Sequence, residues 1–215
     1  MKHIYSFIFI LLFCSVSHSQ NPCPGTPTVD YAGQTYHTVL IGSQCWLKEN
    51  LNVGTMINGI DTAKNNGIIE KYCYNNDPAN CTTYGGFYQW NEAMQYVTTG
   101  KAKGICPTGW HIPLYTEFTT LSTTVSGDGN KLKAIGQGTG NGAGTNTSGF
   151  SALLAGDRSN SNGGYFIGLG FSTSFWSSTE YAEYADFVYL YSSDSNVGFY
   201  NNYKVNGFSV RCAKD

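Results

Sequence analysis

The strongest constraint on how this chain folds is a set of six cysteines that follows an apolar N-terminal segment. They are Cys23, Cys45, Cys73, Cys81, Cys106 and Cys212. The last of them lies three residues before the end of the chain, where a bridge would fasten the terminus to the rest of the molecule. An even number of cysteines in an exported chain favours disulfides, although six cysteines allow many pairings and the sequence alone does not choose among them.

The spacing favours the pairs Cys23–Cys45, Cys73–Cys81 and Cys106–Cys212. The first pair would hold the N-terminus of the mature chain, the second would close a turn-rich loop of residues 74–80, and the third would tie the middle of the chain to its end. A zinc site is the competing interpretation. It needs cysteine pairs about two to four residues apart or neighbouring histidines, and the sequence has neither. We therefore expect no metal ion at these cysteines.

Residues 1–19 have the pattern of a secretory signal peptide. A basic start at Lys2 precedes an apolar run over residues 4–16, and a short polar exit follows before a cleavage site after Ser19. The apolar run is thirteen residues long, whereas a helix that spans a bilayer needs roughly 20. We therefore expect an exported mature chain that begins at Gln20 and has no membrane span.

The composition is typical of a loop-rich extracellular domain. Only 12% of the residues are charged, whereas 15% are aromatic and 26 residues are glycine. This aromatic and apolar content argues against a disordered chain. The formal net charge is −2, so the chain offers no basic surface for nucleic acid. The residues left after the signal peptide suffice for one hydrophobic core.

Apolar segments separated by turns predict a chain made mainly of strands. A hairpin is expected from residues 36–41 and 45–47, and further strands are expected at residues 150–154, 165–167, 174–177, 187–191 and 208–212. Between residues 197–200 and 203–205, the pair Asn201-Asn202 predicts a hairpin turn.

The best helix begins after Pro113 and ends at Gly127. Its apolar face carries Leu114, Phe118, Leu121 and Val125. Shorter helices are expected at residues 91–94 and 130–135, and the glycine- and asparagine-rich residues 136–149 predict a mobile surface loop. No repeat or linker divides the chain. The sequence therefore predicts one disulfide-stabilised α+β domain of mainly antiparallel sheet, with one or two short helices and long loops.

Seven sequence blocks resemble a known family. They are residues 45–51, 72–77, 84–88, 104–113, 149–153, 175–180 and 207–212, and they include Gly-Ile-Cys-Pro-Thr-Gly-Trp-His-Ile-Pro and Gly-Phe-Ser-Val-Arg-Cys. In order and spacing these blocks resemble the Fibrobacter succinogenes major paralogous domain. The resemblance covers residues 29–215 and leaves residues 20–28 as an N-terminal extension. It implies an exported bacterial protein of a kind common in Bacteroidetes and Fibrobacteres, without an established activity.

The late blocks are also similar to the tail of the C-type-lectin-like fold, in the broad form shared with formylglycine-generating enzymes. This similarity implies that the two termini pair in one sheet and that long loops carry a ligand site. One position departs from the family pattern. Where the family usually has Ser or Thr after the proline of Trp-His-Ile-Pro, able to cap the following helix, this chain has Leu114.

The expected location follows from the signal peptide and the family. Its members are exported and are often lipoproteins or surface proteins, so we expect this protein to be secreted or held at the bacterial outer surface, with the periplasm as the alternative. A lipid anchor at Cys14 is a weaker alternative. Lipid-attachment signals place a small residue before the cysteine, and Phe13 is large.

Catalysis is the function that the sequence disfavours. After residue 20 there are two histidines, His37 and His111, and no Gly-x-Ser-x-Gly motif. We expect His111 to be hydrogen-bonded beneath the start of the helix rather than to act as a base. The acidic residues available to a glycoside hydrolase are Asp157, Glu180, Glu183, Asp186 and Asp194. We expect no enzyme and no cofactor, with calcium held by Glu180 and Asp186 as the alternative.

The expected function is a non-catalytic binding or adhesion module. Aromatic rings contact the apolar side of a sugar or peptide while short polar groups bind its hydroxyl and amide groups. The candidate ligand-binding residues are Asp157, Arg158, Tyr165, Trp176, Glu180, Tyr181 and Tyr184. Core packing is the competing interpretation, above all for Trp176. The expected partner is an extracellular glycan or protein, and the alternative is a structural component of the cell envelope without a dedicated ligand.

Overall fold

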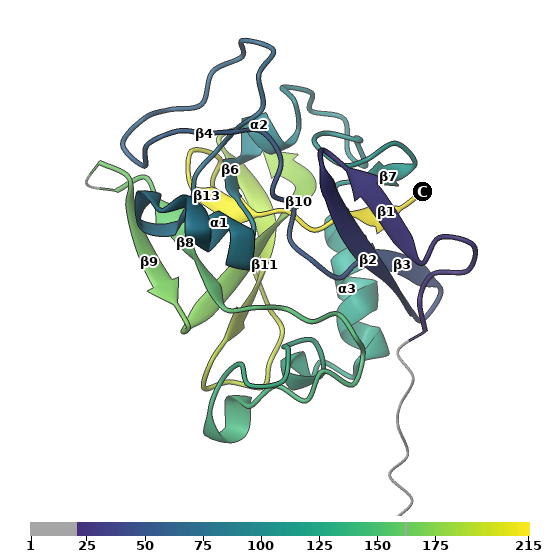
Figure 1. Ribbon diagram of the computed structural model, residues 1–215. Helices are drawn as coiled ribbons and strands as arrows, with labels where there is room; N and C mark the ends of the chain where they lie inside the picture. The colour runs from purple at the N-terminus through teal and green to yellow at the C-terminus, as the bar shows by residue number, and fades with distance from the viewer. Residues whose placement is uncertain (1–20, 162) are drawn as a thin grey trace, which may run out of the picture.

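The computed structural model describes residues 21–161 and 163–215. The predicted signal peptide, its cleavage site after Ser19 and the alternative anchor at Cys14 lie outside these residues. Two large β-sheets dominate the described chain, and the helix α3 (Tyr115–Thr124) lies between them (Figure 1). The strands pair mainly in antiparallel fashion and the helices are few and short, as expected for the predicted α+β class.

The five-stranded sheet brings the two ends of the described chain together. Its strands, in spatial order, are β1 (Thr28–Tyr31), β2 (Gln34–Ile41), β3 (Gln44–Leu47), β14 (Ala213–Lys214) and β7 (Trp110–His111). β2 and β3 form the predicted hairpin, with Val39 opposite Trp46. The C-terminal strand β14 pairs with β3 on one side and with β7 on the other. Both ends therefore share one sheet, as the resemblance implied.

The seven-stranded sheet contains most of the second half of the chain. Its strands, in spatial order, are β12 (Gly198–Tyr203), β11 (Tyr184–Tyr191), β10 (Ser172–Tyr181), β13 (Gly207–Ser209), β8 (Ala155–Ser159) and β9 (Tyr165–Leu169), with β6 (Phe87–Gln89) paired to β13. A separate small sheet joins β4 (Thr55–Met56) to β5 (Glu70–Lys71). Of the predicted closing strand at residues 208–212, only Phe208 and Ser209 belong to a strand, β13, and the chain joins the other large sheet at β14, beyond the predicted range.

The helix predicted after Pro113 is confirmed as α3. Phe118, Leu121 and Val125 are buried, and Phe118 packs on Trp46 of the five-stranded sheet with ring centroids 5.3 Å apart. The other helices are α1 (Pro78–Tyr84), α2 (Trp90–Ala93) and the 3₁₀ helices η1 (Tyr74–Asn76), η2 (Gly129–Lys131) and η3 (Gly140–Gly142).

The start of α3 is capped without the usual Ser or Thr. Leu114 precedes the helix and its side chain accepts no hydrogen bond. The backbone N–H of Tyr115 instead donates to Oγ1 of Thr179 on β10 over 3.1 Å, and the N–H of Leu114 donates to the carboxylate of Glu117 over 2.8 Å. Two other residues therefore satisfy the exposed N–H groups of the first turn.

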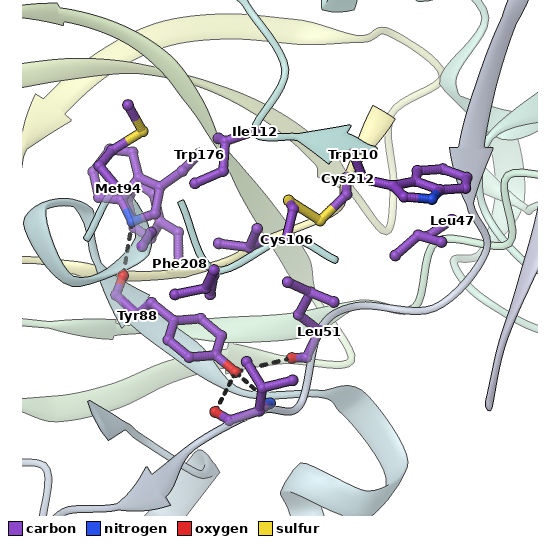
Figure 2. Close-up of a cluster of buried hydrophobic side chains, with 14 of the residues drawn as sticks. Leu47, Leu51, Tyr88, Met94, Cys106, Trp110, Ile112, Trp176, Phe208 and Cys212 are labelled. Carbon is purple, nitrogen blue, oxygen red and sulfur yellow. Dashed lines mark hydrogen bonds between the residues drawn. A yellow bond between two sulfur atoms is a disulfide. The ribbon is translucent and has the colours of Figure 1, made fainter. Parts of the chain in front are cut away.

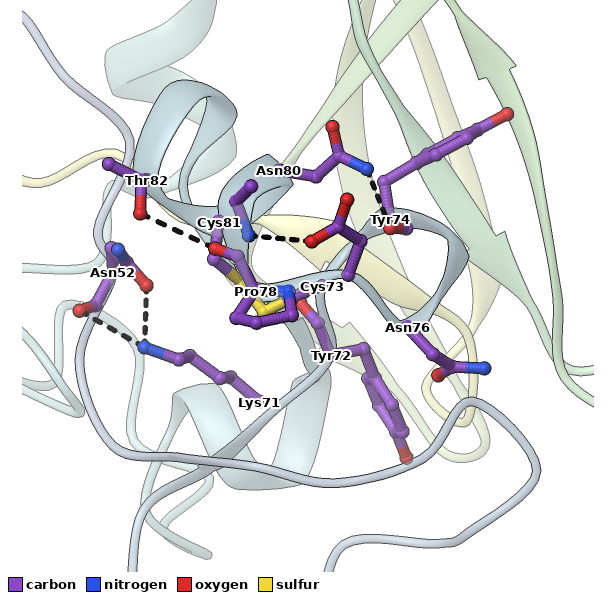
Figure 3. The surroundings of a disulfide bond; sticks show 12 residues. Asn52, Lys71, Tyr72, Cys73, Tyr74, Asn76, Pro78, Asn80, Cys81 and Thr82 are labelled. Atoms are coloured by element: carbon purple, nitrogen blue, oxygen red, sulfur yellow. Dashed lines mark hydrogen bonds between the residues drawn. A yellow bond between two sulfur atoms is a disulfide. The ribbon is translucent and has the colours of Figure 1, made fainter.

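The segment between Cys73 and Cys81 is more helical than the predicted loop. Asp77 accepts a hydrogen bond from the N–H of Ala79 over 2.9 Å, and Pro78 occupies the first turn of α1. The helix then carries Cys81 back to Cys73, which the disulfide joins (Figure 3). The capping aspartate and the proline were visible in the sequence and would have predicted this helix.

Two strand predictions are wrong. β12 continues through Asn201 and Asn202, because these residues pair with Asp186 and Ala185 of the long strand β11, and the chain turns only after Tyr203. Residues 150–154 are not a strand. Ser151 has a φ of 57° and its N–H donates to Oδ1 of Asn146, which removes the extended backbone that a strand requires, so β8 begins at Ala155.

The glycine-rich residues 136–149 form a hydrogen-bonded loop fixed to the end of β11. The N–H of Thr139 donates to the carbonyl of Ser192 over 2.7 Å, and the N–H of Gly144 donates to that of Gln137. The backbone of Gly142 lies so close to Ser192 that a Cβ on Gly142 would stand 2.3 Å from the Ser192 carbonyl oxygen. The prediction of a free loop overlooked that glycine also permits close backbone packing.

The three disulfides are Cys23–Cys45, Cys73–Cys81 and Cys106–Cys212, the pairs that the spacing favoured. The third lies in the largest hydrophobic cluster (Figure 2). In the same cluster the Trp176 ring packs on Phe208 with centroids 4.2 Å apart, and its Nε1–H donates to the Tyr88 carbonyl over 2.8 Å. The core therefore joins both sheets around a covalent bond near the C-terminus.

We expect the disulfide with the longer loop to stabilise the fold more. The bond between Cys106 and Cys212 spans 106 residues of sequence and the bond between Cys73 and Cys81 spans 8. On a chain-entropy estimate, replacing the first pair by serine costs about 4–5 kcal/mol and replacing the second about 2–3 kcal/mol. Urea unfolding of the two double variants measures both losses. Because all four cysteines are buried, the variants are matched, and equal losses would contradict the expectation.

Candidate functional site

Arg158 is buried and holds the fold together, which corrects its prediction as a ligand contact. Only 1% of the residue is exposed. Its Nε–H and Nη2–H donate to the carbonyl of Gly59 over 2.9 and 2.7 Å, and Nη1–H donates to that of Val205 over 2.8 Å. Its guanidinium also lies 4.6 Å from the centre of the Tyr72 ring. With these groups engaged and covered, Arg158 presents no surface to a ligand.

Trp176 and Glu180 also have internal partners. Trp176 is fully buried in the core described above, so the competing interpretation of core packing holds for it. The Glu180 carboxylate accepts a hydrogen bond from Nζ of Lys204 over 2.7 Å, and this ammonium lies over the ring of Trp90. The charge of Glu180 is therefore already compensated within the protein.

The proposed calcium pair does not converge. Glu180 stands opposite Ala185 in the β10–β11 ladder, so the next residue, Asp186, points to the other face of the sheet. The two carboxylates therefore lie on opposite faces of the sheet. Within residues 21–161 and 163–215, no group of three or more His, Cys, Asp or Glu side chains could hold a metal ion.

His111 has the structural role that the sequence predicted. It is 1% exposed, its Nε2 lies 2.9 Å from a carboxylate oxygen of Glu117 in the first turn of α3, and its Nδ1 lies 2.6 Å from Asp215. Burial raises the pKa of Glu117, but the hydrogen bonds from His111 and Leu114 outweigh this effect and the net pKa is lowered. With both ring nitrogens occupied, His111 ties β7 to α3 and to the C-terminal residue.

Tyr181 and Tyr184 are accessible and lie at the turn between β10 and β11, where they stand opposite each other. Tyr181 is 57% exposed. Tyr184 stacks on Tyr203 of β12, with ring centroids 4.4 Å apart. Tyr165, the remaining predicted tyrosine, is exposed at the start of the edge strand β9 and lines neither of the two hollows described next.

A pocket of about 400 Å³ lies beside Tyr181. We call it the tyrosine site, and it is lined by Tyr115, Tyr181, Asp186, Phe199, Tyr200 and Asn201. Strand register explains the grouping, because Asp186 and Asn201 face each other across β11 and β12. The ring of Tyr115, the first residue of α3, meets that of Phe199 at 5.4 Å. An aromatic wall thus surrounds one carboxylate and one amide.

Asp186 is the chemically distinctive group of the tyrosine site. It is 6% exposed, and the hydroxyl of Tyr181 donates to its Oδ2 over 3.3 Å. Burial raises the pKa of the Asp186 carboxyl, and the hydrogen bond from Tyr181 only partly opposes this. The site therefore contains a desolvated carboxylate whose hydrogen bond comes from a neutral hydroxyl.

A second hollow of about 530 Å³ lies at the same end of β12. We call it the amide groove, and it is lined by Ser159, Asn160, Ser161, Asn202, Tyr203, Val205 and Asn206. Hydrogen bonds fix its amides, since Nδ2 of Asn206 donates to Oδ1 of Asn202 and the N–H of Asn160 donates to Oδ1 of Asn206, both over 2.8 Å. Asn201 and Asn202 are consecutive residues of the edge strand β12, so their side chains point to opposite faces and the two hollows lie on either side of this strand.

A further hollow of about 340 Å³ lies between β2 and α1, with Arg211 and Asn50 at its floor. These two groups are engaged with the protein. Arg211 donates to Oδ1 of Asn50 over 2.7 Å and to the carbonyl of Phe150, and Nδ2 of Asn50 donates to the carbonyl of Tyr84 over 2.9 Å. Their hydrogen bonds close the floor, and we assign no ligand to it.

Sequence reasoning identified one member of the tyrosine site, Tyr181, as a ligand contact and considered another, Asp186, only for calcium or for glycoside hydrolysis. It missed Tyr115, Phe199, Tyr200 and Asn201. The last three fell in the wrongly predicted hairpin at Asn201-Asn202. Pairing residues 198–203 with residues 184–189 as continuous strands would have placed Asn201 opposite Asp186 and found the site.

Comparison with known families agrees with the resemblance. The model of the Fibrobacter succinogenes major domain matches residues 39–214, and the chain therefore belongs to this family. Neither the comparison with curated proteins nor that with solved structures found a match. In the described part of the chain, none of the helices combines the length and hydrophobicity needed to cross a membrane.

Asp157, the remaining predicted residue, is expected to lower stability at neutral pH. It is half-buried opposite Ile167, and burial raises the pKa of its carboxyl from 3.8 to about 6. An acid whose folded pKa is raised favours the folded state most below pH 3.8, and this contribution is lost as the pH rises towards 6. Asp157→Asn should therefore stabilise the protein at pH 7.5 by up to about 3 kcal/mol.

Chemical denaturation between pH 3.5 and pH 7.5 measures this effect. The free energy of unfolding of the wild type should fall with pH relative to that of Asp157→Asn, and the two should converge at the acidic end. Asp61→Asn is the control, because Asp61 is exposed and its replacement should leave the difference unchanged. Parallel curves for the wild type and Asp157→Asn would contradict the expectation.

Proposed function

We propose that this protein is an exported, non-catalytic binding module that recognises a glycan through the tyrosine site and the amide groove. One observation carries the proposal. Exposed tyrosines gather with fixed amides and a carboxylate at the end of the seven-stranded sheet where the β10–β11 and β12–β13 turns lie. Tyr200 is 68% exposed and Tyr181 57%. Exposed rings that gather in one place, unlike scattered ones, mark interaction surfaces.

The side chains fit the chemistry of a sugar. A pyranose ring has an apolar face that packs on an aromatic ring, and its hydroxyls need short donors and acceptors in fixed positions. The Tyr184–Tyr203 stack and the exposed ring of Tyr200 supply aromatic surface. Asn202 and Asn206 are already held by hydrogen bonds, so a sugar would meet amides that lose little conformational entropy on binding.

The scaffold suits an exported recognition domain. Three disulfides are typical of an oxidising compartment, and the predicted signal peptide agrees with secretion, display at the outer surface or retention in the periplasm. Pairing of the two termini in one sheet also supports the relation to C-type-lectin-like domains. In such scaffolds the sheets stay rigid while neighbouring turns bear the ligand site.

The absence of catalysis in this proposal rests on the arrangement of the acids. A glycoside hydrolase needs two carboxyl groups on either side of one glycosidic bond. Asp186 points into the tyrosine site, whereas Glu180 lies on the other face of the sheet and is bound to Lys204. His111 is held between Glu117 and Asp215, which leaves it unavailable as a base.

Alanine substitutions in the tyrosine site should weaken glycan binding. Tyr181→Ala and Tyr200→Ala each remove a ring that we expect to contribute about 1–1.5 kcal/mol, so each should raise the Kd about five- to tenfold. The measurement is a screen of the mature domain against glycans and envelope polymers, followed by calorimetry on the best ligand. Tyr191→Ala is the control, because Tyr191 is an exposed tyrosine at the other end of β11.

The same screen separates the alternatives. Saturable glycan binding that ignores both substitutions would place the ligand elsewhere and contradict the proposal. Failure to bind any glycan, together with co-purification with envelope proteins, would favour the structural role. Release of reducing sugar during the screen would identify a hydrolase.

A further inference from the structure

We infer that the tyrosine site binds a positively charged ammonium group, carried by an amino sugar. The inference rests on the proposed glycan-binding function and names the class of sugar. It stands on two features of the site. One is a buried carboxylate that no basic side chain compensates, and the other is a wall of aromatic rings around it.

The charge of Asp186 lacks a cationic partner within the described residues. None of the ion pairs there includes this carboxylate, and its hydrogen bond comes from the neutral hydroxyl of Tyr181. The ammonium group on the neighbouring turn, that of Lys204, is occupied by Glu180, the carbonyl of Ala182 and the ring of Trp90. A buried charge without a partner is costly, and a bound cation would remove that cost.

The lining of the site favours a cation over a neutral or an anionic group. Three aromatic rings lie on the face of Asp186, namely those of Tyr115, Tyr181 and Phe199, whereas the side chain of Tyr200 points to the other face of β12. The negative faces of such rings attract ammonium ions, and the attraction grows when the ion is withdrawn from water. No lysine or arginine lines the site. An anion would therefore meet Asp186 with nothing to neutralise the repulsion.

The amide groove indicates a sugar as the carrier of the ammonium group. Asn201 belongs to the tyrosine site and Asn202, on the other face of the edge strand β12, belongs to the groove. A sugar chain that continues around this edge from a group bound beside Asp186 therefore reaches a row of amides and hydroxyls. These are hydrogen-bonding partners for sugar hydroxyls. A lysine side chain or a choline headgroup carries the same ammonium chemistry on an aliphatic stem, which would leave the groove without hydrogen bonds.

A matched pair of ligands tests the inference. Calorimetry at pH 6 compares a glucosamine trisaccharide, whose amines are protonated, with the N-acetylglucosamine trisaccharide, which has the same backbone and no charge. We expect the wild-type mature domain to bind the amine about tenfold more tightly or better. Asp186→Asn should abolish this preference while it leaves the affinity for the acetylated sugar within about twofold.

Two further variants keep the test decisive. Glu183→Gln removes an exposed carboxylate from the same β10–β11 turn and should retain the preference. Tyr181→Leu changes an exposed ring on the face of Asp186, so it should fold even where Asp186→Asn does not, and it should reduce the preference about threefold or more. Circular dichroism verifies that each variant is folded.

The outcomes distinguish this inference from the proposed function. Equal affinity for the two trisaccharides would overturn the ammonium site and leave glycan binding intact. Failure of both to bind, while an unrelated neutral glycan binds in a Tyr181-dependent manner, would likewise overturn only the inference. If tetramethylammonium or lysine methyl ester binds as tightly as the amino sugar, the assignment of a sugar as the carrier is overturned.

Discussion

The fold depends on the last nine residues, which pass from one sheet to the other through the core. β13 joins the seven-stranded sheet and β14 the five-stranded one. Between them Arg211 lies fully buried against the rings of Phe150 and Phe175, and burial lowers its pKa to about 9. Its hydrogen bonds to Asn50 and Phe150 replace hydration that the guanidinium loses, and the disulfide at Cys212 holds the same segment. This segment therefore forms strand pairings in both large sheets.

This anchoring sets the division between scaffold and site. The segment that ends at Asp215 fixes β3, β7 and β14, and through His111 it also fixes the start of α3. Tyr115 is the first residue of that helix and lines the tyrosine site. The C-terminal blocks that identify the family therefore touch no ligand in the proposed site. They position the helix from which one wall of the site is built.

The sequence predicted what depends on neighbours along the chain and missed what depends on pairing across it. Helical spacing located α3, and alternation with a turn located the β2–β3 hairpin. The role of Arg158 could not be read in this way, because its partners Gly59 and Val205 are remote in sequence. The failure at Asn201-Asn202 has the same origin. A local turn signal was outweighed by the ladder with β11, and that ladder creates the candidate site.

The acids near this end of the seven-stranded sheet are compensated in different ways. Glu180 has the ammonium of Lys204, and Glu117 has the imidazole of His111. Asp186 is buried more deeply than either and has a tyrosine hydroxyl. Because Glu180 and Glu117 are both paired with bases, this sequence is able to place a basic side chain beside a carboxylate in this region. Departures of this kind from the general rule of paired buried charges concentrate at functional sites. The uncompensated carboxylate is therefore better explained by a partner that arrives from outside than by the needs of the fold.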